Sequence, residues 1–235
     1  MVFCICIATG MAIQTHFLIP TNAQFTVPGN VISIEQDVML KGKSNLHKVG
    51  VINFLVIERM DFYRFMWENK KLVSEYSYRE YKSKDELVDE FSTNVEYYKE
   101  IKVEKYSHLI DYLVTIYPEE EVGKMIEHLK IHNETAGNSD ALAIMLALIG
   151  MKEEKNWLDS KERIVITGTL DAEGNVLPVG DIYLKSLTAI KSKADILIIP
   201  SGNVQQLEAV DEKELQIVPV TTIEEAIFWM DQNIK

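Results

Sequence analysis

The chain has 235 residues, of which 47% are hydrophobic and 26% charged, with 11 glycines and 6 prolines. This composition fits one large globular domain, or a medium domain with attachments, and it excludes disordered, collagen-like and low-complexity proteins. The formal net charge of −12 argues against DNA or RNA as a partner, because an acidic protein repels phosphate backbones.

The first segment in chain order is almost wholly apolar. No Asp, Glu, Lys or Arg occurs before Glu35, and the main polar interruption of residues 2–20 is Gln14 to His16. About 20 apolar residues span a bilayer as a helix, so residues 1–20 are predicted to be a single-pass membrane anchor. A cleaved signal peptide, which normally begins with basic residues, and a buried pair of strands are the alternatives.

Residues 21–117 are predicted to form a small β-rich and helical N-terminal region. Residues 27–30 have the composition of a turn, and the β-branched run at 31–40 predicts a strand. A second turn at 41–45 leads to residues 49–57, which are predicted to be a strand buried on both faces.

A change of composition marks the stretch from Glu58 to Tyr117, where charges are dense and nine of the ten tyrosines lie. Ser83 and Glu86 have the spacing of a capping box. Apolar residues follow it at helical spacing (Leu87, Phe91, Val95 and Tyr98). We expect an amphipathic helix with a solvated acidic face, and tyrosines at core edges or interfaces.

Residues 118–235 alternate between helices and strands. Pro118 begins an amphipathic helix, and residues 139–149 are apolar nearly all round, which predicts a buried helix that Gly150 ends. Residues 163–170 are predicted to be a strand that enters a hairpin turn at 171–175. The remaining expected elements are a helix at 181–193, a strand at 196–199, a short helix after Asn203, a strand at 217–220 and a last helix opened by the capping box Thr222–Glu225. This alternation indicates the α/β (α+β) class, with a mixed sheet and flanking helices.

Metal and phosphate chemistry have little support in the sequence. The five histidines form no metal-binding motif, and the pair His128 and His132 lacks a third ligand. Cys4 and Cys6 are too close together to close a useful loop, and no Cys/His spacing suggests zinc. No glycine-rich phosphate loop is present. We therefore expect no metal and no cofactor.

A serine at the start of the buried helix is the first candidate for chemistry. In Gly137-Asn138-Ser139-Asp140, Ser139 lies at the helix end where backbone N–H groups lack partners. Such groups can stabilise an oxyanion. Serine is also a favoured N-cap residue, so capping alone is the alternative explanation.

Lys185 lies in the first turns of the helix predicted at 181–193. The positive end of that helix and apolar neighbours such as Ile182 and Leu184 both disfavour the ammonium form, which lowers the lysine pKa. A neutral amine can accept the proton of a serine hydroxyl, which is too weak a nucleophile without a base. Ser139 and Lys185 are therefore a candidate Ser–Lys pair.

Two segments resemble the proteolytic domain of Lon-type ATP-dependent proteases. The stretch from Ile164 to Leu187 is similar to the family's strand, hairpin and helix around its catalytic lysine, through the segments IVITGTL and GNVLPVGDIYLKSL. Residues 194–203 (ADILIIPSGN) continue the match. Gly137 and Ser139 match the glycine and serine of the family's Gly-Pro-Ser-Ala-Gly motif. The resemblance covers residues 120–235.

The resemblance implies roles for individual residues. Ser139 falls on the nucleophile, Lys185 on the general base, and Thr167 on a threonine that supports the lysine. The residues that flank the serine complete the expected site as supporting positions (Gly137, Asn138 and Asp140).

Three positions depart from the family's pattern. Asn138 replaces a proline, Asp181 replaces the second glycine of a Gly-Gly pair, and Asp140 replaces a small residue beside the nucleophile. Asp140 is either a helix-start acid that favours the helix dipole or a carboxylate that reaches Lys185. In the second case it would raise the lysine pKa and weaken the base.

The N-terminal half is similar to membrane-anchored, ATPase-free Lon-like proteases of Gram-positive bacteria, through Val27–Gly29 and Val51–Phe54 after an apolar N-terminus. Those proteases usually carry a PDZ module, of which no pattern is seen between Tyr117 and Ser139, and no Walker motif is present. We expect a Lon-like proteolytic domain at 118–235, placed outside the cytoplasm by a single pass through the cell membrane.

Two functions remain open. The first is an ATP-independent serine endopeptidase that hydrolyses polypeptides, and the second is an inactive Lon-like domain that binds peptides or acts as a scaffold. The presence of Ser139, Thr167 and Lys185 favours the first function, and the altered flanking residues favour the second. An oligomer is compatible with either.

Overall fold

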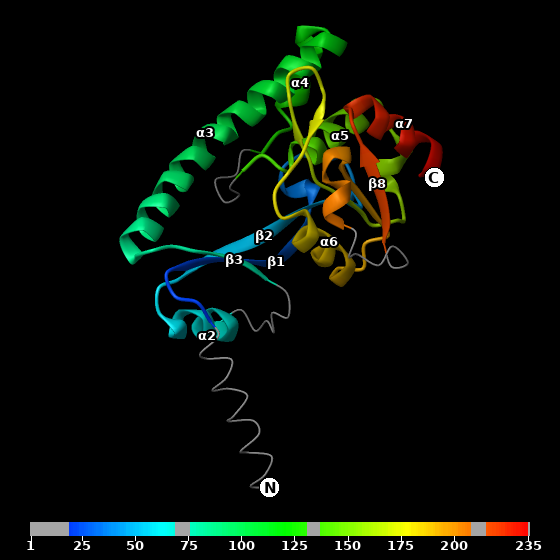
Figure 1. Cartoon of the computed structure of the whole chain (residues 1–235). Coiled ribbons are helices and arrows are strands. Elements are labelled where there is room, and N and C mark those ends of the chain that lie inside the picture. Colours follow the sequence, from blue (N-terminus) through cyan, green and yellow to red (C-terminus); the bar gives the residue numbers. More distant parts are fainter. Residues whose placement is uncertain (1–18, 69–75, 131–136, 208–214, 235) are drawn as a thin grey trace, which may run out of the picture. The chain divides into compact units, whose positions relative to one another are not determined.

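The computed structural model describes residues 19–68, 76–130, 137–207 and 215–234 (Figure 1). Contacts divide the chain into two compact units, the first made of Met1–Pro28 and Ile52–Asn94 and the second of Gly29–Val51 and Val95–Lys235. The candidate site residues all belong to the second unit. The domain boundaries expected after residues 20 and 117 stay predictions.

The elements alternate in type along the chain. The strands are β1 (Ala23–Ser33), β2 (Leu46–Val56), β3 (Ser77–Glu80), β4 (Ile164–Ile166), β5 (Thr169–Leu170), β6 (Val176–Leu177), β7 (Ile196–Pro200) and β8 (Gln216–Val220). The helices are α2 (Arg59–Glu68), α3 (Lys84–Ile116), α4 (Glu119–Ile126), α5 (Ala141–Lys152), α6 (Ile182–Lys191) and α7 (Ile223–Asn233), with 3-10 turns η1 (Ile34–Gln36), η2 (Asn156–Asp159) and η3 (Ser201–Leu207). The predicted mixed α/β class is confirmed.

The first unit is built on aromatic packing. The start of β1 pairs antiparallel with β3, and the buried Phe25 ring lies 5.5 Å from Phe54 and 5.1 Å from Phe62. The predicted cap of α3 is present, because the Glu86 N–H donates to Ser83 Oγ at 3.2 Å. The Glu86 carboxylate reaches back to the Lys82 N–H rather than to the Ser83 N–H.

In the second unit, β2, β4, β7 and β8 pair in parallel. Alternate residues of these strands enter two apolar clusters, because successive side chains of a strand point to opposite faces. Ile164 and Ile198 lie in the cluster that contains α5, whereas Val165 and Leu197 lie in the cluster that contains the apolar face of α6. The sheet therefore lies between α5, which follows the candidate serine, and α6, which carries the candidate lysine (Figure 1).

Two local predictions in the N-terminal half are wrong. Residues 27–30 were expected to turn, but they lie inside β1, and the strand expected at 31–40 ends at Ser33. A Cβ on Gly29 would lie 2.2 Å from the Gly50 carbonyl oxygen. The glycine therefore allows two backbones to approach closely and does not form a turn.

The single strand predicted at 163–170 is also wrong in its length. β4 ends at Ile166, two residues bridge, and β5 then pairs with β6 in the predicted hairpin. The Gly174 N–H donates to the Asp171 carbonyl in that hairpin turn. The interruption at Thr167 and Gly168 positions the serine, as shown below.

No helix within the described residues is long and apolar enough to cross a bilayer. Residues 1–18, which carry most of the predicted anchor, lie outside the described part of the chain.

Candidate active site

Ser139 lies in a turn directly before α5. The helix begins at Ala141, two residues later than predicted, and its N-cap is Asp140, whose side chain makes no capping hydrogen bond. Capping therefore does not explain Ser139. The turn depends on Gly137, whose φ of 86° lies in the left-handed region that favours glycine.

Backbone hydrogen bonds hold the turn, both within itself and to Gly168. The Ala141 N–H donates to the Asn138 carbonyl at 3.0 Å, and the Gly168 N–H donates to the Ser139 carbonyl at 2.8 Å. The Leu142 N–H donates to the Gly168 carbonyl at 3.1 Å. Two N–H groups expected to be unpaired at the start of α5 therefore have partners, and these bonds hold the serine in place.

Thr167 connects the sheet to this turn. Its N–H donates to the Ile198 carbonyl on β7 at 3.0 Å, and its hydroxyl donates to the Ser139 carbonyl at 3.0 Å. The side chain is fully buried. The expectation that Thr167 supports the lysine stays a prediction, because this hydroxyl bonds to the serine's turn.

Gly168 allows the close approach on which these bonds depend. A Cβ at this position would lie 3.0 Å from Val176 Cγ1 and 3.2 Å from Leu142 Cδ2. Such contacts are tighter than normal packing, so a side chain would force β4 and α5 apart. The predicted strand is interrupted here because the Gly168 N–H and carbonyl bond to the turn and to the start of α5 instead of to a neighbouring strand.

Lys185 lies in α6, where its N–H donates to the Asp181 carbonyl at 3.0 Å. Only 4% of its surface is exposed. Burial lowers the pKa of Lys185 to about 8, and the Asp181 and Asp140 carboxylates oppose this shift only in part. An amine with this pKa is available as a base near neutral pH.

Lys185 differs from the other buried lysines that the structure describes. Lys48 and Lys105 each form ion pairs with carboxylates, whereas Lys185 Nζ has no hydrogen bond or ion pair to any described residue. A buried amine without a counterion is costly in its charged form, which is why it suits a base better than a structural ion pair.

The loop before α6 is held by a buried amide. Asn203 Oδ1 accepts a hydrogen bond from the Val179 N–H, and Asn203 Nδ2 donates to the Val179 carbonyl, both at 2.9 Å. A Cβ on Gly202 would lie 2.7 Å from Pro178 Cγ. These contacts fix the start of α6 and therefore Lys185. The sequence placed Asn203 at the end of the matching segment 194–203, before a short helix, and did not predict this role.

The serine and the lysine are not hydrogen-bonded to one another. Within the described residues, no such bond joins Ser139 Oγ to Lys185 Nζ. Ser139 lies two residues before the start of α5, and Lys185 lies in the first turn of α6, within the same unit. Their pairing as a catalytic dyad stays a prediction.

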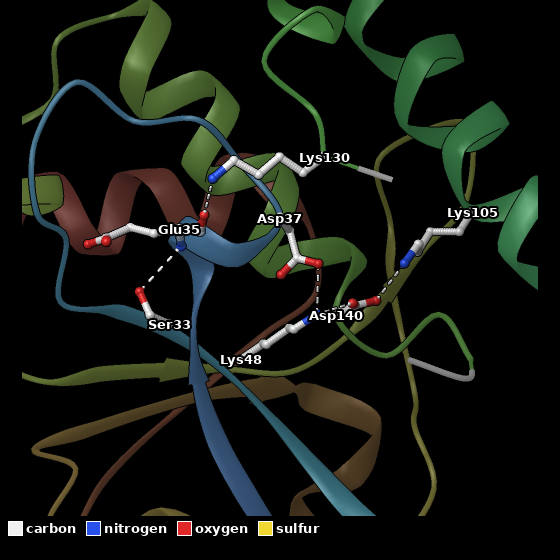
Figure 2. Close-up of polar contacts among 7 residues, drawn as sticks. All are labelled: Ser33, Glu35, Asp37, Lys48, Lys105, Lys130 and Asp140. Atoms are coloured by element: carbon white, nitrogen blue, oxygen red, sulfur yellow. Dashed lines mark hydrogen bonds and ion pairs between the residues drawn. The ribbon is translucent and has the colours of Figure 1, made fainter. Parts of the chain in front are cut away.

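A buried ionic cluster adjoins the serine turn (Figure 2). Lys48 Nζ contacts Asp37 Oδ1 at 2.8 Å and Asp140 Oδ2 at 3.1 Å, and Lys105 Nζ contacts Asp140 Oδ1 at 2.9 Å. We call these four residues the ionic quartet. Sequence reasoning singled out Asp140 but missed the quartet, because its members come from four separate segments. A further sequence signal is Lys48, a charge at the start of a long apolar strand.

Burial alone would raise the pKa of Asp140, but Lys105 and Lys48 more than offset it and lower the pKa below its usual value. Burial would likewise lower the pKa of Lys48, and the Asp140 and Asp37 carboxylates instead raise it. Lys48 therefore stays an ammonium and cannot act as a base at neutral pH. Asp140 is the N-cap residue of α5, a position where a carboxylate favours the helix dipole, although its side chain makes no capping hydrogen bond. It makes no ion pair with Lys185, and its charge raises the lysine pKa by less than burial lowers it.

The described histidines have backbone partners rather than metal-site geometry. His128 Nδ1 lies 3.1 Å from the Met39 carbonyl oxygen, and His108 Nδ1 lies 3.0 Å from that of Leu170. His132 lies outside the described residues. Among those described, no group of three His, Cys, Asp or Glu side chains is arranged for a metal ion.

Comparison with known families gives a match to this part of the chain. Residues 128–230 match the family model of the Lon protease (S16) C-terminal proteolytic domain. The matched residues include Ser139, Thr167 and Lys185, together with α5 and α6. The resemblance noted in the sequence is therefore supported for this segment.

Curated relatives align over the same region. An archaeal Lon protease of Archaeoglobus fulgidus is 27% identical over 120 residues, which are 49% of this chain and 19% of the relative. An archaeal Lon protease of Halobacterium salinarum is 32% identical over 93 residues, 39% of this chain and 13% of the relative. A Lon protease of Methanosarcina barkeri is 43% identical over 68 residues, which are 28% of this chain and 8% of the relative. The chain spans less than a fifth of the length of these relatives.

Proposed function

We propose that this protein is a serine endopeptidase in which Ser139 is the nucleophile and Lys185 the general base. The observation that carries the proposal is the state of Lys185, which is buried, has no counterion within hydrogen-bonding distance among the described residues, and has a pKa lowered to about 8. It lies in the segment that matches a proteolytic domain. The backbone bonds that hold Ser139 give further support.

The reaction follows from these two groups. The neutral Lys185 amine takes the hydroxyl proton as Ser139 Oγ bonds to the carbonyl carbon of the peptide. When the C–N bond breaks, the lysine ammonium gives this proton to the leaving amine nitrogen, and an ester remains on Ser139. Water then hydrolyses the ester by the same route, and both residues return to their starting state.

The turn also supplies donors for the oxyanion that forms in each step. Within the described part of the chain, no acceptor receives a hydrogen bond from the N–H of Ser139 or of Asp140. Donors that are already fixed in place stabilise developing negative charge at little reorganisation cost. We assign these two N–H groups to the oxyanion, in place of the first N–H groups of α5.

The proposed substrates are polypeptides, and we also propose that the reaction needs no ATP. We further propose that residues 1–20 anchor the chain in the cell membrane, with the proteolytic domain outside the cytoplasm. In that case the full chain stays in the membrane pellet after a high-salt wash. Release by salt alone contradicts the anchor without affecting the proposed chemistry.

Hydrolysis of casein by the full chain in detergent tests the dyad. Ser139→Ala and Lys185→Ala should each lower the rate by at least about 10³-fold, and the double variant should lose no more, because a nucleophile and its base act as a unit. Lys191→Ala, at an exposed position on the same helix, is the matched control and should leave the rate unchanged. Equal rates for the unaltered protein and Ser139→Ala contradict the proposal and favour a non-catalytic peptide-binding role.

A further inference from the structure

Asp140 carries a full buried charge on the residue next to the proposed nucleophile. Its side chain is 90% buried and makes no capping bond to α5. It also makes no ion pair with Lys185, since both of its carboxylate oxygens are bonded to other lysines. These lysines therefore determine the surroundings of the Asp140 carboxylate.

The lysines reach Asp140 from distant parts of the chain. Lys48 comes from β2 and Lys105 from α3, and their side chains are 5% and 1% exposed. Lys48 is shared with Asp37, so that the quartet holds two positive and two negative charges (Figure 2). Burying four charges carries a desolvation cost that pairing offsets only in part, and hydrophobic residues could fill the same space without that cost. The quartet is therefore weak evidence for a purely stabilising role.

We propose that Lys48 and Lys105 are positioning residues of the active centre, which hold the Asp140 carboxylate and neutralise it so that Lys185 can serve as the base. The inference rests on the proposed Ser139–Lys185 chemistry. Without these two ammonium groups, a buried carboxylate beside the nucleophile would draw a proton to Lys185 and oppose its function. The quartet thus makes an acidic residue compatible with a position next to the serine.

Asp140 is the member of the quartet whose charge acts on Lys185. The carboxylates that raise the pKa of Lys185 are those of Asp181, at the start of its own helix, and Asp140, on the serine turn. Burial outweighs both, so the lysine pKa stays near 8. The groups around Asp140 are Lys48 and Lys105, which bond to it, Asp37, which shares Lys48, and Tyr106, whose ring lies beside Lys105 Nζ.

Tyr106 does not interfere with a titration in this range. Lys105 Nζ lies 4.8 Å from the centre of the Tyr106 ring. Burial, together with the Asp140 and Asp37 carboxylates, raises the pKa of Tyr106 to about 12. A pH-dependent change between pH 6 and about 10 can therefore be attributed to the Lys185 amine rather than to this phenol.

The test measures the Lys185 pKa by a method that does not need activity. Trace labelling with acetic anhydride modifies only neutral amines, and mass spectrometry of the Lys185 peptide at each pH gives its titration in the full chain in detergent. Lys105→Met removes one neutralising charge and should move this titration, and the acid limb of casein hydrolysis, to higher pH by about one unit. Lys105→Arg keeps the charge and should leave both in place.

A second pair of variants tests the same inference independently of Lys105→Met, which could fail to fold. Asp140→Asn removes the carboxylate and should move the Lys185 titration to lower pH, and the double variant Lys105→Met/Asp140→Asn should return it toward the original value. An unchanged titration in both Lys105→Met and Asp140→Asn overturns the inference. A shifted titration in a protein that does not cleave casein would uphold the inference about Lys185 and contradict only the proposed activity.

Discussion

The Thr167 hydroxyl donates a hydrogen bond of 3.0 Å to the Ser139 carbonyl oxygen. This bond connects the end of β4, in the centre of the second unit's sheet, to the turn that carries the proposed nucleophile. A second bond, from the Gly168 N–H to the same oxygen, lies beside it. The position of the serine therefore depends on where β4 ends as much as on the start of α5.

Thr167→Val tests this relationship with a side chain of nearly the same shape. We expect the free energy of unfolding to fall by about 1 kcal/mol, because one buried hydrogen bond is lost. The value of kcat should fall about tenfold with little change in KM, since the serine moves relative to the lysine while distant substrate contacts remain. Steady-state kinetics and urea unfolding measure the two effects.

Thr167→Ser retains the hydroxyl and is the matched control. It should keep most of the activity even though the loss of a buried methyl group lowers stability by about 1 kcal/mol. If the serine variant loses as much kcat as the valine variant, packing at this position matters and the hydrogen bond to Ser139 does not.

Activity should rise with pH through about 8. Only the neutral Lys185 amine accepts the serine proton, and burial lowers its pKa to about 8. The acid limb of kcat/KM should therefore have its midpoint near that value rather than near the ordinary value for lysine. A midpoint near 6.5 would instead indicate a histidine base and contradict the assignment.

The sequence predicts the buried helix well because residues 141–150 are apolar on every side, and all of them are buried. It misplaces the helix start, since Ser139 and Asp140 both suit the N-terminus of a helix. The Ser139 carbonyl accepts bonds from Thr167 and Gly168, and this long-range contact keeps the residue outside the helix. Local preference could not reveal a partner 28 residues away.

The same reason explains the broken strand and the ionic quartet. Thr167 and Gly168 lie in a run that reads as one continuous strand, and only their contacts with the serine turn explain the break. Lys48 and Asp140 are 92 residues apart, and no periodicity connects them. The residue types of the site could be predicted from motifs, whereas the electrostatics around it depends on how distant segments pack.

Gly168→Ala should damage the site through packing. Its added Cβ would lie 3.0 Å from Val176 Cγ1, so we expect a loss of stability of about 1–3 kcal/mol and a lower kcat. Thermal unfolding and casein hydrolysis give both values. Gly180→Ala, where a Cβ would meet nothing within 4 Å, is the control. A neutral result at Gly168 would mean that β4 and α5 can separate without disturbing Ser139.

The two kinds of buried lysine should respond to substitution with opposite signs. Lys185→Met replaces a buried amine that has no counterion among the described residues, and it should raise the free energy of unfolding at pH 7 by roughly 1–3 kcal/mol while it abolishes cleavage. Lys105→Met leaves Asp140 with a single lysine and should lower the free energy of unfolding by about 3 kcal/mol. Urea unfolding of both variants measures the difference.

The pH dependence of these changes separates their causes. The lowered Lys185 pKa means that the unfolded chain holds this proton up to about pH 10.5 while the folded protein releases it near 8. The stability gained in Lys185→Met should therefore be complete below about pH 8 and fade as the pH rises toward 10.5. The loss in Lys105→Met should persist across that interval, because Asp140 stays ionised throughout. A Lys185→Met variant that is less stable than the unaltered protein at pH 7 would show that the ammonium is satisfied in the folded state, and Lys185 would then be a structural residue rather than the base.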